Sequence, residues 1–396
     1  MFKFNFKESS TSLVLNVLLA IYIIAEILYG HTLISQACML LFVGATILMC
    51  AWEKMWNVFL LPYLVLILWS VLMISLGNVI SQSNAVDLTR TMVFNLIFLL
   101  GFTMYYKTVG NVEVVFQTYK ISAVFACMPI LIMGTGSALS GGRLQNTGIN
   151  SNFLGTFVAI AFLILIYQII GKKKTNILLN FFQIILFSSV ILLSGSRSAL
   201  LMVAICAYVL WVYRKPKRFI INSLLVIATV GVVLYVLLNV GFLYDLVGNR
   251  VEDLIVYVQV GEVDDNSLTA RARFIETGWE RFIKNPYLGY GADCFRTIAA
   301  GQYAHNNFIE LLFSFGIISI LYYIPFVYCV VMVVRYHKHY FSINRDLFLF
   351  SAGIIVAILV CDYSRVTYYE RIHLLPLNIA ILTIVSHKPK KAKSDV

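Results

Sequence analysis

Residues 268–321 read LTARARFIETGWERFIKNPYLGYGADCFRTIAAGQYAHNNFIELLFSFGIISIL and lie between two long apolar regions of the chain. The first part of this stretch predicts a helix from Ala270 to Lys284. One side of that helix is charged and the other is apolar, which is typical of a helix that lies in a membrane interface. The apolar side holds Phe274, Gly278, Trp279, Phe282 and Ile283.

The second part of the stretch predicts a turn that leads to a new helix. Pro286 ends the first helix, and the paired glycines Gly289 and Gly291 allow a positive φ. His305 then precedes Asn306, and Asn is a favoured N-cap residue. We therefore expect His305 to stand at the mouth of an apolar helix.

Composition indicates a polytopic membrane protein. Hydrophobic residues make up 60% of the 396 residues, charged residues only 12%, and the mean hydropathy is +0.85. The seven cysteines show no Cys-x-x-Cys spacing and fall mostly in apolar runs, which favours buried free thiols over disulfides or a zinc site. We expect an all-α fold.

Twelve apolar segments approach the length of about 20 residues that a bilayer crossing needs. They lie near 13–30, 33–51, 57–77, 91–106, 118–134, 150–170, 177–193, 198–213, 219–240, 306–334, 347–361 and 372–386. The chain thus divides into helices 1–9 in residues 1–240, a large loop with the interfacial helix in residues 241–305, and helices 10–12 with a basic tail in residues 306–396.

Lys and Arg predict the orientation of the chain. With both termini in the cytoplasm, 19 of the 30 basic residues lie on the inner side, as the positive-inside rule prefers. Fifteen of those 19 are Lys, whereas ten of the 11 outer basic residues are Arg. Arg can grip phosphate or carboxylate oxygens in pairs, so this bias favours anion recognition on the outer side. Some of these arginines pair with Asp or Glu instead.

Two outer turns carry arginine among small residues. The turn Ser194-Gly195-Ser196 places Arg197 at the start of a helix, where the backbone N–H groups and the dipole favour an anion. The alternative is an arginine that only caps the turn. Arg143 follows Ser140-Gly141-Gly142. It is weaker evidence for an anion site, because Gly-Gly-Arg is common in turns. No Walker loop, dinucleotide fingerprint or His-Glu-x-x-His motif is present, so we expect neither metal nor cofactor.

These motifs, taken in order, resemble the O-antigen polymerase and ligase superfamily, which includes the Wzy-type polysaccharide polymerases. The resemblance covers most of the chain and includes the number of spans and the large loop after the ninth. Its motifs are Arg143 followed by Gly148 and Asn152, Gly195-Ser196-Arg197, Arg271 followed by Pro286 and Gly289-x-Gly291, and His305-Asn306 before a helix that runs to Phe315-Gly316-Ile317.

The resemblance implies a GT-C-like, metal-independent, inverting glycosyltransferase at the outer face of the cytoplasmic membrane. Its donor and acceptor would be polyprenyl-diphosphate-linked glycans. A flippase and a chain-length regulator would be its protein partners, and it would not bind nucleic acid. Arg197 and Arg271 would hold the diphosphate and His305 would serve the acceptor hydroxyl. Arg143, Arg273, Asn306 and Glu310 are further candidates for substrate binding, with Arg273 two residues off the family position.

The chemistry agrees with those roles. A departing diphosphate needs its charge stabilised, which fixed arginines can do, and the attacking hydroxyl needs a base that is neutral near pH 7. A helix N-terminus would oppose protonation of His305. Glu310 either orients His305 or pairs with an arginine. Glu26, set in apolar surroundings, is expected to line a cavity.

Other interpretations remain at this point. A ligase would transfer the glycan to lipid A core or to protein. The polymerase is favoured only because residues 143–155 and His305-Asn306-Asn307-Phe308 are more similar to the family polymerases. A transporter or flippase would also have twelve spans. It would be expected to show internal repeats and charges near mid-membrane, and we find neither in the sequence. A non-catalytic scaffold would leave His305 and Arg197 replaceable.

Overall fold

The computed structural model describes residues 10–139, 144, 150–171, 176–214, 216–260 and 266–389, and throughout these ranges its regular structure is helical, with no β-strand. Each of the twelve predicted spans coincides with a helix. They are α1 (Ser10–Tyr29), α2 (Leu33–Met49), α3 (Leu60–Ser75), α4 (Gln82–Val109), α5 (Val112–Leu139), α6 (Ser151–Ile170), α7 (Ile177–Leu193), α8 (Arg197–Arg214), α9 (Phe219–Asn239), a broken helix made of α14 (Asn307–Phe315), a 3-10 segment (Gly316–Tyr323) and α15 (Ile324–Arg335), then α16 (His337–Cys361) and α17 (Arg371–Ser386).

The chain is an all-α, multi-pass membrane protein. Among the described residues, eight helical segments are long and apolar enough to cross a membrane, and four shorter apolar helices accompany them. The shorter ones are α2, α3, α7 and α17.

Helix α4 is longer than the sequence predicted. It begins at Gln82 instead of residue 91, because Ser81 caps it by accepting a hydrogen bond from the Asn84 backbone N–H. Its first turns carry Asp87 and Arg90, which form an exposed ion pair at 3.2 Å. These charges interrupt the apolar run without interrupting the helix, so hydropathy alone placed the boundary too late.

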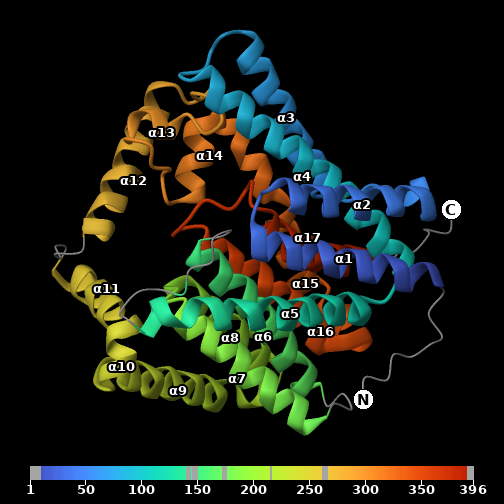
Figure 1. The fold of residues 1–396 in the computed structure, drawn as a ribbon, viewed down its shortest axis with the longest axis vertical. Coiled ribbons are helices and arrows are strands. Elements are labelled where there is room, and N and C mark those ends of the chain that lie inside the picture. Colours follow the sequence, from blue (N-terminus) through green and yellow to red (C-terminus); the bar gives the residue numbers. More distant parts are fainter. Residues whose placement is uncertain are drawn as a thin grey trace.

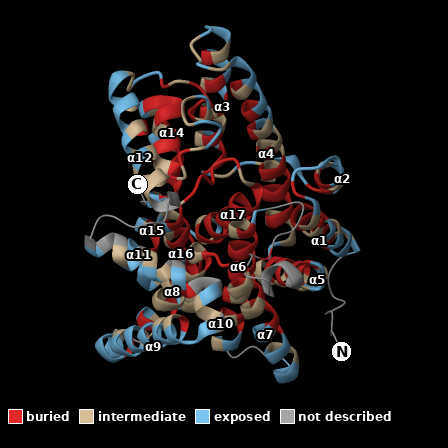
Figure 2. Cartoon of the chain, turned by 60° about the vertical axis from the view of Figure 1, so that its left-hand side comes forward, coloured by how far each residue is buried: buried red, intermediate tan, exposed pale blue. Residues whose placement is uncertain are grey.

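The helices surround a core that is most complete around α6 and α17 (Figures 1 and 2). Within the most apolar window of α6, 72% of residues are buried in the protein, against 11% for α9. Helix α9 lies at the edge of the bundle, and its exposed Leu, Ile and Val side chains suit contact with lipid.

Hydrogen bonds join the helix connections at one end of the bundle, which we call the site end. The backbone N–H of Asn307 donates to the carbonyl of Asp362 at 2.7 Å, and Ile80 donates to Tyr290 at 3.1 Å. The Cys361 thiol donates to the Ser198 carbonyl at 3.4 Å. Six segments therefore form one layer: residues 30–32, 76–81, 150–152, 194–198, 285–306 and 362–370.

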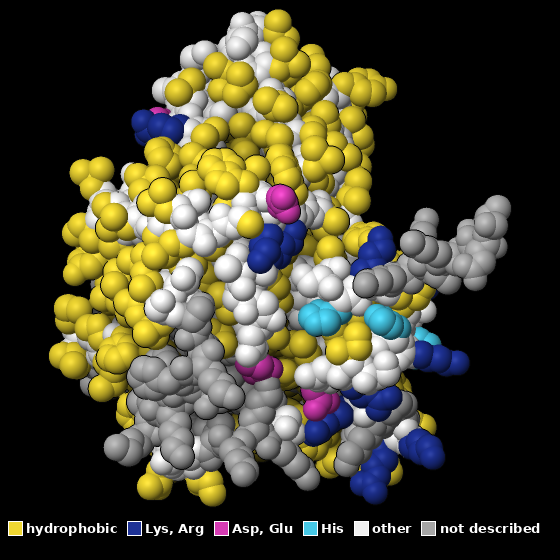
Figure 3. Space-filling model, turned by 90° about the vertical axis from the view of Figure 1, so that its right-hand side faces the viewer, with side chains coloured by type: hydrophobic (Ala, Val, Ile, Leu, Met, Phe, Trp, Pro, Cys, Tyr) yellow, Lys and Arg dark blue, Asp and Glu magenta, His cyan; other side chains and the backbone are white. Residues whose placement is uncertain are grey.

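The opposite end is held by a second set of contacts. Arg214 pairs with Asp346 at 3.2 Å, which ties the end of α8 to the start of α16. His339 hydrogen-bonds through Nε2 to the His387 carbonyl at 3.0 Å, which ties the start of α16 to the end of α17. Figure 3 looks onto the right-hand side of Figure 1 and shows Lys, Arg and His side chains gathered on one part of that side.

The segment after α9 contains several helices. They are α10 (Gly241–Leu243), α11 (Asn249–Val260), α12 (Asn266–Lys284) and α13 (Phe295–Ile298). Helix α12 confirms the helix predicted at 270–284 and begins four residues earlier, at Asn266. It packs against α14 and carries part of the candidate site.

Candidate active site

His305 is held between two hydrogen-bonded residues at the start of α14. Asn306 caps the helix, as predicted, because its side-chain oxygen accepts from the Ile309 N–H at 3.1 Å. The buried carboxylate of Glu310 reaches back and accepts from the Ala304 N–H at 2.9 Å. His305 itself has a φ of 53°, an uncommon conformation for a residue with a side chain. The backbone around the imidazole is therefore fixed on both sides.

The imidazole of His305 lies among aromatic rings. Its centroid is 4.0 Å from that of Tyr303, and its plane is nearly parallel to that of Phe274 at 6.2 Å. Phe274 comes from α12, which approaches α14 closely because Gly278 has no side chain: a Cβ there would overlap with Ile309. Of the apolar side predicted for α12, Phe274 thus lies against His305 and Gly278 against α14, whereas Trp279 and Ile283 are exposed.

The predicted turn after α12 is present and lies against α14. Gly289 and Gly291 have φ values of 74° and 99°. The N–H groups of Tyr290 and Gly291 donate to the carbonyls of Phe313 and Ser314 at 2.9 and 3.0 Å. The chain can run this close to α14 only where a residue has no Cβ, since one on Gly289 would come within 2.6 Å of the Ser314 oxygen.

Burial and two nearby arginines favour the neutral form of His305. Burial, and then the positive charges of Arg271 and Arg296, lower the pKa of His305 to about 4. Arg296 pairs with Asp293 at 2.7 Å and lies over the Tyr303 ring at 5.6 Å. A neutral imidazole agrees with the sequence prediction, but its causes are burial and guanidinium groups, where the prediction relied on the helix dipole. At neutral pH His305 can therefore accept a proton.

The arginines of α12 differ in exposure. Arg271 is half-buried, and its charge acts on both Tyr303 and His305. Arg273, two residues further on, is exposed. The structure therefore brings Arg271 together with His305 and leaves the side chain of Arg273 in solvent or at the membrane surface.

Arg197 is the first residue of α8, at the site end. The turn before it is tight, with Gly195 at a φ of 60° and the side chains of Ser194 and Ser196 buried. Those two serines pack so closely on α6 that a Cβ on Gly155 would lie 2.6 to 2.7 Å from them. Arg197 thus begins its helix next to the start of α6. Arg143, with Ser140, Gly141, Gly142 and Gly148, lies outside the described residues.

Three residues near His305 carried no specific sequence signal. Tyr303 contacts His305 directly, and the charges of Arg271, Arg296 and Arg365 all act on its phenol. Arg296 and Arg365 belong to the outer arginines recognised from the sequence, but nothing in their local sequence distinguished them from the others. Tyr303 was one aromatic residue among many.

Asn306 and Glu310 have intrachain roles in this structure. Both side chains are buried and are engaged with backbone N–H groups of the loop or helix that carries His305. We therefore assign them to positioning His305. Among the described residues, no group of three or more His, Cys, Asp or Glu side chains is arranged to hold a metal ion.

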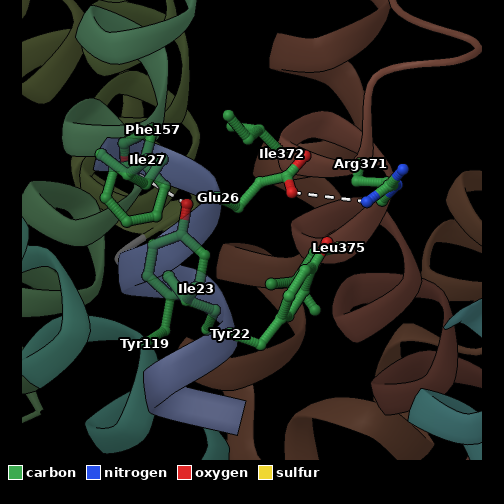
Figure 4. A pocket seen from close by; sticks show the side chains of 9 residues that line it. All are labelled: Tyr22, Ile23, Glu26, Ile27, Tyr119, Phe157, Arg371, Ile372 and Leu375. Atoms are coloured by element: carbon green, nitrogen blue, oxygen red, sulfur yellow. Dashed lines mark hydrogen bonds and ion pairs between the residues drawn. The ribbon is translucent and has the colours of Figure 1, made fainter. Parts of the chain in front are cut away.

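Glu26 lines a cavity, as predicted, but the cavity is separate from His305 (Figure 4). The cavity has a volume of about 10 Å³, room for about one water molecule. The carboxylate of Glu26 pairs with Arg371 at 3.4 Å and with His31 at 2.9 Å. His31 also contacts Glu370 at 3.3 Å. Burial alone would lower the pKa of His31, but these two carboxylates raise it to about 10.

Comparison with known proteins supports the resemblance. Residues 182–324 match a family model described as O-antigen ligase. The matched range contains Arg197, Arg271 and His305, and it confirms the resemblance to the O-antigen polymerase and ligase superfamily. No curated protein matches the chain significantly.

Proposed function

We propose that this protein is a glycosyltransferase that moves a glycan from a polyprenyl diphosphate onto a lipid-linked repeat unit, as a polysaccharide polymerase of the O-antigen or capsule type. The family match supports a glycosyl-transferring enzyme of the O-antigen ligase and polymerase kind. The observation that carries the proposal is the neutral, half-buried imidazole of His305 with Arg271 and Arg296 beside it.

The proposed step is a single displacement. The acceptor hydroxyl oxygen bonds to the anomeric carbon of the donor while the bond from that carbon to the diphosphate oxygen breaks. His305 takes the hydroxyl proton, and the diphosphate leaves with the electron pair. Guanidinium groups stabilise the charge that develops on the leaving oxygens. Such a displacement inverts the anomeric centre and needs neither a metal ion nor a cofactor.

Two arginines are proposed to hold the diphosphate. Arg271 lies close enough to His305 to lower its pKa, so an anion bound there would sit next to the base. Arg197 stands at the N-terminus of α8, where the helix dipole favours negative charge. Arg143 and Arg273 are proposed to contact more distant parts of the substrate.

The proposed location of the site follows from the distribution of basic residues between the two ends of the bundle. We place the site end on the outer face of the cytoplasmic membrane, with both termini inside, because the basic connections at the other end favour the cytoplasm. A lipid-linked glycan assembled inside would need a flippase to reach this face. A chain-length regulator is a further proposed partner.

A ligase is the second candidate, because the matched family model is described as O-antigen ligase. The donor and the leaving group would be the same in a ligase, and only the acceptor would differ. The roles of His305, Arg197 and Arg271 would therefore not change.

The test uses the full-length protein in lipid nanodiscs with one lipid-linked repeat unit as substrate. Mass analysis of a polymerase product should show a ladder of repeat units on one lipid. If the substrate stays single until lipid A core is added, and then appears on that core, the protein is a ligase. If neither acceptor is extended, while the same protein in sealed vesicles moves the lipid-linked unit across the bilayer, the transferase proposal fails and the transporter interpretation returns.

A further inference from the structure

Arg365 is a buried cation in the connection between α16 and α17. Only 4% of its surface is exposed. Its Nη1 atom donates to the Asn152 carbonyl at 3.1 Å and to the Thr156 hydroxyl at 3.0 Å. Its Cζ atom lies 5.6 Å from the centroid of the Phe153 ring. The first two turns of α6 thus fix the plane of the guanidinium group.

The rest of the guanidinium group is buried, and among the described residues neither Nε nor Nη2 has a hydrogen-bond acceptor. These two atoms form one edge of the guanidinium plane, the edge that grips two oxygens of a phosphate or carboxylate side by side. An arginine that served only to fasten the connection to α6 would not need this edge to remain open.

The charge of Asp362 acts on Arg365, but the oxygens of that carboxylate are hydrogen-bonded to other residues. The carboxylate of Asp362 accepts from Thr367 at 2.6 Å and from Tyr323 and Asn307 at 3.1 Å each. Among the described residues, no carboxylate lies within ion-pair distance of Arg365. The nearby thiol of Cys361 is only a weak acceptor.

Burying a charged group without satisfying its donors is unfavourable. Removing Arg365 from water lowers its pKa for that reason. A bound anion would supply the acceptors that these buried donors lack. The position of Arg365 indicates which anion this is.

Arg365 lies in the connection that packs against the start of α14, where Asn307, two residues after His305, accepts from the Thr367 N–H at 2.8 Å and donates to Asp362 at 3.1 Å. The charge of Arg365 acts on the Tyr303 phenol together with the charges of Arg271 and Arg296. The three arginines come from separate segments: α12, α13 and the connection before α17. Arg296 already has Asp293 as a partner, whereas the buried Nε–Nη2 edge of Arg365 has no acceptor among the described residues.

We propose that the Nε–Nη2 edge of Arg365 binds two oxygens of one phosphate of the lipid diphosphate. This inference rests on the proposed function and adds a substrate-binding residue outside the range matched by the family model. In this arrangement the anion supplies the acceptors that Arg365 lacks.

The test measures diphosphate binding by the full-length protein in nanodiscs, separately from glycan transfer. Inorganic phosphate, inorganic diphosphate and polyprenyl diphosphate are titrated against the unaltered protein and against Arg365→Lys, which keeps the charge and loses the paired donors. Arg90→Lys, at an exposed ion pair on α4, is the matched control. We expect Arg365→Lys to weaken binding of both diphosphates at least tenfold and Arg90→Lys to leave it unchanged.

Several outcomes decide the matter. Equal diphosphate affinity in Arg365→Lys would overturn the inference, as would binding of inorganic phosphate alone. If Arg365→Lys does not fold, Thr156→Val is measured instead, since it removes the acceptor that orients Nη1; there we expect a loss of several fold, and unchanged affinity would overturn the inference.

The inference and the proposed function can fail separately. Loss of diphosphate binding in Arg365→Lys, in a protein that transfers no glycan to any acceptor, would support the site and refute the transferase. Normal glycan transfer, with the same KM for the lipid-linked donor in Arg365→Lys as in the unaltered protein, would support the transferase and refute the site.

Discussion

His305 and Tyr303 lie with their ring centroids 4.0 Å apart, Arg296 lies over the Tyr303 ring at 5.6 Å, and the charge of Arg271 from α12 acts on both residues. The base and the cations are thereby brought together by residues that are far apart in the chain. A transferase needs this arrangement, because the proton acceptor and the stabiliser of the leaving group must serve the same bond change.

The first prediction concerns His305. Replacing it with Ala should lower the rate of glycan transfer by about 10² to 10⁴, because the acceptor hydroxyl loses its base. The length of the lipid-linked glycan measures this, with His337→Ala as control, since His337 is exposed at the opposite end of the bundle. Single repeat units should accumulate in a variant that still reaches the membrane. Unchanged chain length in His305→Ala would end the catalytic role.

The second prediction concerns pH. The pKa of His305 is lowered to about 4, so its neutral form predominates at every pH above that value. The transfer rate should therefore be insensitive to pH around neutrality and should fall as the pH drops through about 4, where the imidazole becomes protonated. Arg296→Gln removes a positive neighbour and should move this acid limb to higher pH. Arg281→Gln, exposed on α12, should not move it.

A limb near pH 6.5, the ordinary value for His, would show that the imidazole is neither desolvated nor close to the arginines. An identical limb in Arg296→Gln and the unaltered protein would show that another group titrates. Both outcomes are read from kcat/KM against pH, which reports the free enzyme.

The third prediction separates two neighbouring arginines. Arg271→Gln should reduce kcat/KM by about a hundredfold, as removing one preorganised charged donor does in other enzymes. Arg273→Gln should change it by less than about threefold, because that side chain is exposed. Equal losses in the two variants would show that the general positive charge of α12 matters more than the placement of Arg271.

The fourth prediction concerns Glu310 as a positioning residue. Glu310→Ala leaves the buried Ala304 N–H without an acceptor, which costs about 1–3 kcal/mol of folding stability. Glu310→Gln retains an oxygen at that position and should restore most of the activity. Because Glu310 acts through the backbone at His305, the pH profile of the Gln variant should match that of the unaltered protein. A total loss of activity in stable Glu310→Gln would instead indicate that the carboxylate acts on substrate.

Sequence alone predicted the parts of the site that depend on local rules. The apolar runs located a helix at each of the twelve predicted positions, Asn306 was recognisable as an N-cap, and the glycines of 289–291 were recognisable as a turn. The convergence of side chains from distant segments obeys no such rule. Arg365 could not be told from other outer arginines, because its significance lies in two donors left open by the packing of α6.

Glu310 illustrates the same limit on a smaller scale. Its spacing from His305 placed it on a different face of the helix, yet the chain before α14 turns back so that Ala304 meets the carboxylate. That turn depends on a positive φ at His305, which is not a glycine and so gave no signal.

The last prediction tests the contact between α12 and α14. A Cβ on Gly278 would overlap with Ile309, so Gly278→Ala should push α12 away from α14 and move Phe274 off the imidazole. Overpacking of this kind typically costs about 1–3 kcal/mol, and we expect the transfer rate to fall with the melting temperature of the protein. Adding Ile309→Ala removes the Cγ2 atom that the new methyl group would strike. The double variant should therefore recover activity relative to Gly278→Ala, whereas no recovery would place the role of Gly278 elsewhere than in this contact.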